Sequence, residues 1–275
     1  MKISIFGLGY VGSMLCEVLS DKHDIIGVDI DEEKVKNAKV EATTDLKKAI
    51  IETDTSIICV GTPENIDGSV NLNYINNVFE DISEVLKIKK KHHTFIIRST
   101  IPAGTTELMI KKYLTSLDVS VSYNPEFFRE ATAVKDFLNP PFIIYAATDK
   151  KAEKAVKELH KGIDAEIIKI DFKEAESMKM ICNVFHALKV VFANEIGRFC
   201  KAYSLDGMRI MEVFCKDKQL NISPYYLKPT GKPYGGHCLP KDLRSFIDLS
   251  KKKKLDLPVL FNVETSNEKC VREKK

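Results

Sequence analysis

Cys238 is the residue whose surroundings most clearly indicate chemistry. It lies in the segment Pro-Tyr-Gly-Gly-His-Cys-Leu-Pro-Lys-Asp at residues 233–242. The second proline of this segment is typical of a first helical turn, so we expect Cys238 just before a helix N-terminus, where the helix dipole lowers a thiol pKa. Lys241 adds a cation, and Gly235 and Gly236 let a ligand approach the backbone. The pattern predicts a nucleophilic cysteine.

The other cysteines lack such a setting. A cysteine is most often a small buried side chain, and this is what we expect of Cys16, Cys59, Cys182, Cys200, Cys215 and Cys270. The total of seven is odd, and there is no C-x-x-C pair or metal-ligand spacing. Neither a disulfide framework nor a bound metal is therefore predicted.

A second set of polar side chains falls on one predicted helix. Residues 173–203 contain no proline and one glycine, which favours a single long helix. Lys179, Asn183 and His186 are spaced at i, i+4 and i+7 and so share a face. The spacing suits a polar site and suits a solvent-facing stripe equally well.

Glu126 and Glu130 form a pair of carboxylates four residues apart. Such pairs can divide acid and base roles, although an exposed glutamate-rich turn is commoner. Their place directly after a predicted strand favours the functional interpretation.

The N-terminus carries a dinucleotide-binding pattern. A strand at residues 2–6 ends in Gly-Leu-Gly-Tyr-Val-Gly at 7–12, a helical pattern follows, and a second strand at 23–29 ends in Asp29. G-x-G-x-x-G alone is a weak signal, but with this strand, helix and acid it becomes strong. Asp29 is expected to accept the ribose hydroxyls, which favours NAD over NADP because a 2′-phosphate would be repelled.

Two regions must position these residues. Further strands are predicted at 56–60, 94–98, 119–122 and 142–146. Their alternation with helices predicts a parallel, doubly wound sheet, so the loops at 61–63, 99–104 and 123–126 should face one crevice. Beyond the long helix we expect helices at 206–216, from Pro240 onward and at 257–271, with a loop at 221–234. The expected fold is α/β: a Rossmann-type domain at 1–172, then an all-helical domain at 173–275.

Composition is that of an ordinary globular protein. The 275 residues are 44% hydrophobic and 29% charged, with a net charge of +3 that is too small to indicate nucleic-acid binding. No membrane span is present, and glycines interrupt the apolar N-terminus, which also lacks a small-residue cleavage site. We expect a cytoplasmic protein.

Taken together, the sequence resembles the UDP-glucose/GDP-mannose 6-dehydrogenase family, and most closely its GDP-mannose branch. The resemblance spans nearly the whole chain, in order: residues 7–12, Val-Asp-Ile-Asp at 28–31 with Lys34, Gly-Thr-Pro at 61–63, Ser-Thr-Ile-Pro at 99–102, Asn-Pro-Glu-Phe at 124–127, Lys179 with Asn183, Asn-Glu at 194–195, and residues 235–242.

The resemblance implies an NAD-dependent double oxidation of a nucleotide-sugar C6 alcohol to a carboxylate. An aldehyde has no alcohol hydrogen to lose, so the thiolate of Cys238 would add to it and form a thiohemiacetal that can be oxidised to a thioester. Lys179 and Asn183 would stabilise the oxyanion, Asp242 would lie beside the cysteine, Glu126 would be the base for hydrolysis, and Thr100 would contact the reacting centre.

The implied binding residues form two further sets. Those for the cofactor are Gly7, Gly9, Tyr10, Val11, Gly12, Asp29, Lys34, Thr62, Glu130 and Lys241. Those for the substrate are Phe127, Phe128, His186, Tyr226, Tyr234, Gly235 and Gly236. The family's dimer core implies a homodimer through residues 173–203 and 257–271.

Two departures from the family pattern bear on function. The connection between Lys34 and the Thr-Thr-Asp at 43–45 is short, and the family's third, nucleotide-binding domain does not follow within the 275 residues. One explanation is a partner chain that supplies that domain. Two other functions stay open: a two-domain hydroxyacid-type dehydrogenase, which needs one hydride transfer and no cysteine, and a truncated, non-catalytic or partner-dependent subunit.

Overall fold

The computed structural model describes residues 1–129, 132–218 and 226–272. These residues form two compact units, one of Met1–Pro63 with Asn71–Lys179 and one of Glu64–Val70 with Met180–Lys275. The division falls inside one long helix. The domain boundary expected at residue 172 remains a proposal.

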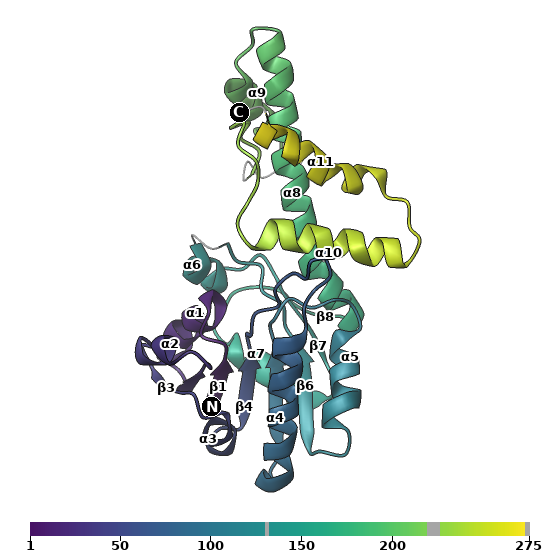
Figure 1. Cartoon of the computed structure of the whole chain (residues 1–275). Helices are drawn as coiled ribbons and strands as arrows, with labels where there is room; N and C mark the ends of the chain where they lie inside the picture. The colour runs from purple at the N-terminus through teal and green to yellow at the C-terminus, as the bar shows by residue number, and fades with distance from the viewer. Residues whose placement is uncertain (130–131, 219–225, 273–275) are drawn as a thin grey trace. The chain divides into compact units, whose positions relative to one another are not determined.

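The first unit alternates strands and helices (Figure 1). Its elements are β1 (Lys2–Phe6), α1 (Tyr10–Leu19), β2 (Asp24–Val28), α2 (Glu32–Lys36), β3 (Glu41–Thr43), α3 (Leu46–Glu52), β4 (Thr55–Ile58), α4 (Asn73–Lys89), β5 (His93–Ile97), α5 (Thr105–Met109), the π-helical η1 (Ile110–Leu114), β6 (Val119–Tyr123), α6 (Ala133–Leu138), β7 (Ile143–Ala147), α7 (Lys150–Leu159), β8 (Ile167–Lys169) and the first turns of α8 (Phe172–Ala202).

The strands form one eight-stranded sheet in the order β3-β2-β1-β4-β5-β6-β7-β8. From β3 to β6 all neighbours are parallel, which confirms the predicted Rossmann-type sheet. β7 runs antiparallel to β6, and β8 runs parallel to β7. An apolar run carries no information about strand direction, so this reversal was not predicted.

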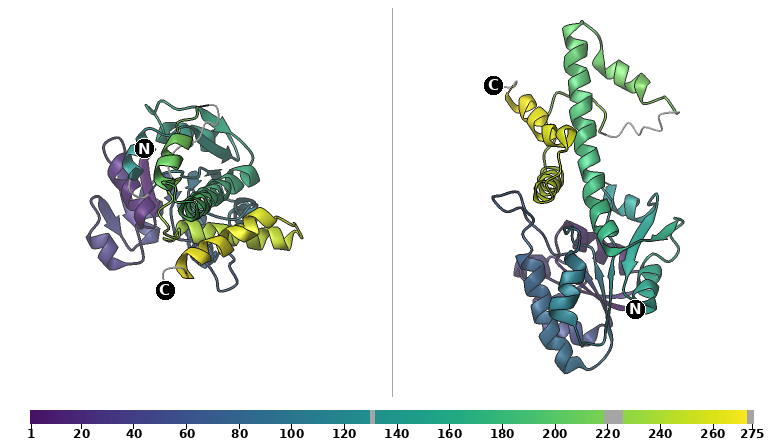
Figure 2. Two further views of the ribbon diagram at one scale, coloured as in Figure 1. Left: turned by 90° about the horizontal axis from the view of Figure 1, so that it is seen from above. Right: turned by 90° about the vertical axis from the view of Figure 1, so that its right-hand side faces the viewer.

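Successive side chains of each strand enter different cores on the two faces of the sheet. On β4, Ile57 packs with α1 and α7, whereas Ile58 packs with α3 and α4. Helices therefore cover both faces of the sheet (Figure 2). The carboxyl ends of the parallel strands β4, β5 and β6, and the loops that follow them, lie along one edge of the sheet.

Helix α8 contributes to both units. Ala175, in its first turns, is fully buried in the core between the sheet and α4. Farther along, Val184 and Ala187 pack with Leu243 and Val263 in the core of the second unit. The structure confirms the predicted long helix. The helix is continuous because it contains no proline that would interrupt its hydrogen bonds.

The second unit also contains α9 (Gly207–Phe214), α10 (Cys238–Lys252) and α11 (Pro258–Arg272). Arg244 on α10 pairs with Glu64 at 3.1 Å and with Glu264 on α11. These contacts hold the segment Glu64–Val70 against α10. Across the described part of the chain, no helix combines the length and apolar character needed to cross a membrane.

Candidate active site and cofactor site

The turn between β1 and α1 requires glycine at two positions. Gly7 has φ +91°, and a Cβ there would lie 2.9 Å from the carbonyl carbon of Cys59. A Cβ on Gly12 would lie 1.9 Å from the carbonyl oxygen of Gly7. Gly9, the N-cap of α1, faces open space, and a Cβ at this position would have no heavy atom within 4 Å. The turn thus leaves the N-terminus of α1 accessible to an anionic group.

Asp29, at the end of β2, holds this turn in place. Its carboxylate accepts hydrogen bonds from the backbone N–H of Leu8 at 2.7 Å and of Asp31 at 3.0 Å, and Lys34 Nζ lies 3.4 Å away. A carboxylate offers about four acceptor positions, so one remains for a ribose hydroxyl.

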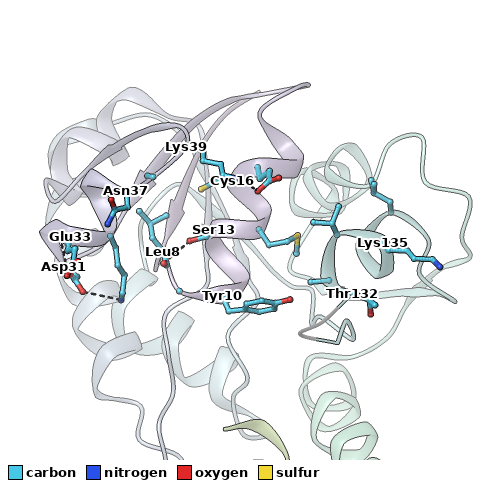
Figure 3. Close-up of a pocket in the computed structure, with 18 of the residues that line it drawn as sticks. Leu8, Tyr10, Ser13, Cys16, Asp31, Glu33, Asn37, Lys39, Thr132 and Lys135 are labelled. Atoms are coloured by element: carbon cyan, nitrogen blue, oxygen red, sulfur yellow. Dashed lines mark hydrogen bonds and ion pairs between the residues drawn. The ribbon is translucent and has the colours of Figure 1, made fainter. Parts of the chain in front are cut away.

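A cavity of about 1250 Å³ opens beside the turn. The cavity is lined by Gly9 at the N-cap of α1, by Tyr10 and Ser13 of α1, by Lys34 of α2 and by Lys135 of α6. In Figure 3 the Tyr10 ring extends from the start of α1 toward the side of Thr132. Small-molecule sites commonly have about 300–1000 Å³, so the space suits a large cofactor. The glycine turn, the acid and the cavity together fit a dinucleotide.

The loops after β4, β5 and β6 meet, as the parallel topology predicts. Thr62 Oγ1 donates to the carbonyl oxygen of Thr100 at 2.7 Å, and Ser99 Oγ donates to that of Val60 at 2.7 Å. Tyr123, at the end of β6, donates from its hydroxyl to the Ser99 carbonyl at 3.3 Å. Thr62 and Thr100 are therefore neighbours, although the sequence separates them by 38 residues.

Glu126 and Lys179 form a buried ion pair. Lys179 Nζ lies 2.6 Å from Glu126 Oε1, and both side chains are 10% exposed or less. Within the described residues, Glu126 Oε2 has no hydrogen-bond partner. One carboxylate oxygen is thus held by a cation while the other can still accept a proton.

Asn124 orients the segment that carries Glu126. Its Oδ1 accepts hydrogen bonds from Arg98 and from His160 Nε2 at 2.9 Å, and its Nδ2 donates to the carbonyl oxygen of Ile144 at 2.8 Å. Because burial, aided by Arg98, lowers the pKa of His160 to about 3, the ring is neutral and carries its proton on Nε2.

Phe127 and Phe128, expected to line the substrate pocket, both pack into cores. The Phe127 ring lies 5.3 Å from Phe142. The guanidinium of Arg98 lies 6.0 Å from the Phe128 ring centroid. Both rings are only partly buried, so their role toward a substrate stays a prediction.

Cys238 is exposed and is the first residue of α10. The helix therefore begins two residues earlier than we expected from Pro240, which is accommodated because the first-turn N–H groups have no partner within a helix. Gly236 before it has φ +75°, and open space surrounds both Gly235 and Gly236. By contrast, burial raises the thiol pKa of Cys16 and of Cys59 to about 12.

Asp242 connects the first turns of α10 to α8. Its Oδ2 accepts a hydrogen bond from Asn183 Nδ2, and its Oδ1 lies 3.2 Å from Lys241 Nζ. Asp242 is 1% exposed and Asn183 is 7% exposed. The pair thus brings Asn183 and the Cys238 helix together, while the expected cofactor role of Lys241 stays a prediction.

The remaining predicted substrate residues lie in the second unit. His186 and Tyr226 have ring centroids 5.1 Å apart. Tyr234 is buried, which raises its pKa, and its backbone N–H donates to Asn267 Oδ1 at 2.8 Å. Glu130 lies outside the described residues. Among the residues that are described, no group of three or more acidic, histidine or cysteine side chains could hold a metal ion.

Comparison with known proteins identifies the family. The NAD binding domain of the UDP-glucose/GDP-mannose dehydrogenase family matches residues 1–41 and 35–164, and the central domain of the same family matches residues 173–269. The chain belongs to this family. It is an NAD-dependent nucleotide-sugar dehydrogenase, and NAD is its cofactor.

Individual relatives agree with this membership. GDP-mannose 6-dehydrogenase of Pseudomonas syringae pv. tomato is 40% identical over 97% of this chain and 68% of its own length. Among solved structures, a UDP-glucose dehydrogenase from Pyrobaculum islandicum matches with a TM-score of 0.86 and 29% identity, over 97% of this chain and 68% of that one. GDP-mannose dehydrogenase from Pseudomonas aeruginosa matches with a TM-score of 0.75 and 36% identity, over 99% and 69%.

The sequence patterns did not lead us to two buried residues of the first unit. Arg98 follows a strand, and Glu176 precedes Lys179 by three residues on α8. Both are charged and almost wholly buried, Arg98 at 4% exposure and Glu176 at 0%. The helical spacing of Glu176 from Lys179 was a usable signal, but nothing local to Arg98 indicates its burial.

Proposed function

We propose that this protein oxidises the C6 alcohol of a nucleotide sugar to a carboxylate through a covalent intermediate on Cys238. The observation that carries the proposal is the placement of Cys238: an exposed thiol in the first turn of α10, preceded by two unobstructed glycines, on the helix that Asn183 and Asp242 connect to α8.

The cysteine makes the second oxidation possible. NAD, when bound, takes up one hydride in each of the two oxidations. After the first oxidation, the thiolate of Cys238 adds to the aldehyde carbon, and the aldehyde oxygen takes up a proton and becomes a thiohemiacetal hydroxyl. The former aldehyde hydrogen now lies on a carbon that bears a hydroxyl, so it can leave as hydride while the hydroxyl loses its proton. The product is a thioester. Water adds to it, the carbon–sulfur bond breaks, and the carboxylate and the thiol are released.

The buried ion pair suits the hydrolytic step. Glu126 Oε2 has no protein partner within the described residues, and the family resemblance implies that Glu126 is the base that takes a proton from the attacking water. Lys179 and Asn183 would stabilise the negative oxygen of the tetrahedral intermediate, and Thr100 would contact the reacting centre. The carboxylate of Asp242 would hold the Asn183 amide in a donating orientation.

GDP-mannose is the substrate we favour. GDP-mannose 6-dehydrogenase of Pseudomonas syringae pv. tomato is 40% identical to this chain, whereas the Bacillus subtilis UDP-glucose 6-dehydrogenase YwqF is 30% identical. A hydroxyacid-type dehydrogenase would have no use for Cys238, and a non-catalytic subunit would not need the Glu126–Lys179 pair. We also propose a homodimer in the cytoplasm.

The number of NADH molecules formed per sugar tests the proposal. With limiting GDP-mannose or UDP-glucose, the protein should yield two NADH per sugar, while Cys238→Ala should yield no more than one. Cys215→Ala, a change at a thiol that we assign no role, is the matched control and should yield two. One NADH per substrate from the unchanged protein would favour the hydroxyacid class. The absence of turnover with any nucleotide sugar would overturn the proposal for this chain.

A further inference from the structure

Glu176 is a buried carboxylate that the reaction described above does not use. It lies on α8 and is 0% exposed. Its Oε1 accepts the backbone N–H of Thr106 at 2.7 Å, and its Oε2 accepts the backbone N–H of Gly104. Among the described residues, no lysine or arginine forms an ion pair with it. Burying a carboxylate without a cation is costly, so these two hydrogen bonds are the compensation.

The two N–H groups belong to the start of α5. Gly104, the N-cap of α5, has φ +90° and provides no side chain to cap the helix. Helix N-termini leave unpaired N–H groups and carry a partial positive charge. Glu176 therefore caps α5 from a helix that is distant in sequence, 72 positions beyond Gly104.

The segment that precedes α5 carries Thr100. Its strand side is anchored by the hydrogen bonds of Ser99 to Val60 and of Thr62 to the Thr100 carbonyl, each at 2.7 Å. Its helix side is anchored by Glu176 at Gly104. Both ends of the Thr100 loop, residues 99–104, are thus held to different parts of the first unit.

Glu176 and Lys179 lie on the same face of α8. They are three residues apart, which corresponds to a rise of about 4.5 Å along the helix and to neighbouring side-chain positions. Lys179 in turn is paired with Glu126 at 2.6 Å. One rigid stretch of α8 therefore contacts the Thr100 loop through Glu176 and the Glu126 segment through Lys179.

We propose that Glu176 is a positioning residue that holds the Thr100 loop at a fixed position relative to Lys179 and Glu126. This inference rests on the proposed function, because Thr100, Lys179 and Glu126 are the residues that would face the reacting sugar. A displacement of about 1 Å at a reacting centre can reduce a rate by about a hundredfold, so a small shift of this loop is enough to matter.

The kinetic test compares Glu176→Gln with Glu107→Gln. Glu107 pairs with Lys173 at 3.1 Å and so joins the same two helices, but its side chain is 53% exposed. Glu176→Gln keeps the size of the side chain and replaces one acceptor oxygen by an amide that faces an N–H donor. We expect kcat to fall about ten- to a hundredfold with KM for the sugar changed less than about threefold. Glu107→Gln should match the unchanged protein in both constants.

Amide hydrogen exchange gives a second readout that needs no turnover. In Glu176→Gln, the amides of Gly104 and Thr106 should exchange faster than in the unchanged protein, while β1 and β4 exchange as before. Glu176→Asp, which keeps the charge on a shorter side chain, is the variant to use where Gln does not fold, and it should show the same changes to a smaller degree.

The outcomes separate this inference from the proposed function. An active parent protein with an equally active Glu176→Gln variant would overturn the positioning role. So would equal loss of kcat in Glu176→Gln and Glu107→Gln, or unchanged exchange at Gly104 and Thr106. An inactive parent protein would instead count against the proposed function, and the exchange experiment would then decide whether Glu176 holds the loop.

Discussion

Two buried histidines, His93 and His160, are neutral in the folded protein. His93 Nδ1 lies 2.9 Å from the ammonium of Lys89, which can only donate, so the ring must carry its proton on Nε2 and donate to Ser56 Oγ at 2.7 Å. Burial, aided by the charge of Lys89, lowers the pKa of His93 to about 3. Both histidines thus lose part of their ordinary proton affinity when the chain folds.

This difference predicts a dependence of stability on pH. An unfolded histidine has a pKa of about 6.5 and takes up a proton below that pH, while the folded ring does not until about pH 3. Each histidine should therefore lower the free energy of unfolding by about 1.4 kcal/mol for each pH unit below about 6.5. Urea denaturation at pH 7.5, 6.0 and 5.0 measures this fall.

The two rings together make the free energy of unfolding fall with decreasing pH, and His93→Gln should remove about half of that pH dependence. This holds whatever the stability of the variant at pH 7.5. A slope in His93→Gln equal to that of the unchanged protein would show that His93 is already protonated in the folded state.

The start of α1 shows how an element depends on residues with no side chain. Gly12 lets the helix approach the carbonyl of Gly7, and Gly9 leaves its N-terminus open. We therefore predict that Gly12 serves folding and that Gly9 serves ligand binding, although both belong to one motif.

Alanine at these two positions should give opposite results. Gly12→Ala should lower the melting temperature markedly, since its Cβ would lie 1.9 Å from a backbone oxygen that cannot move freely. Gly9→Ala should keep the melting temperature, because nothing lies within 4 Å of its Cβ, but should lose most of the stabilisation that NAD confers. Thermal unfolding with and without NAD measures both, and equal NAD-induced shifts in Gly9→Ala and the parent would contradict the cofactor role of Gly9.

For the whole molecule, an exposed apolar stripe on α8 supports the proposed homodimer. Phe185, Phe192 and Phe199 recur every seven residues and are 55%, 41% and 55% exposed. Residues seven apart lie on one face of a helix. Large apolar surfaces of this kind are typical of protein interfaces, and a second copy would cover them.

Phe199→Asp should therefore shift the mass measured by light scattering from that of a dimer to that of a monomer at micromolar concentration. A charge buried in an apolar interface is costly, and this is the reason for the expected dissociation. Ile88→Asp, at a 63% exposed position on α4, is the matched control and should remain dimeric. A monomeric mass for the parent protein would refute the proposed assembly.

Much of the fold and site could be predicted from local patterns. The glycine turn, the acid at the end of β2 and the long helix α8 each depend on residues that are close in sequence, because turns, caps and helical faces are local structures. The loops at the ends of parallel strands could also be grouped, since parallel topology places them along one edge. The family resemblance then gave the expected role of Cys238.

Other features depended on contacts between distant segments. The reversal of β7, the buried pair of Glu126 and Lys179, and the capping of α5 by Glu176 all join residues many positions apart. A charged residue is exposed in most proteins, and nothing in the local pattern marks Arg98 as buried. For Glu176 the helical spacing from Lys179 was a signal, but its partners Gly104 and Thr106 could not be predicted from it. The sequence alone therefore determined which residues could carry the chemistry, while the tertiary structure decided which of them are held together, because burial and strand pairing arise only when the chain packs.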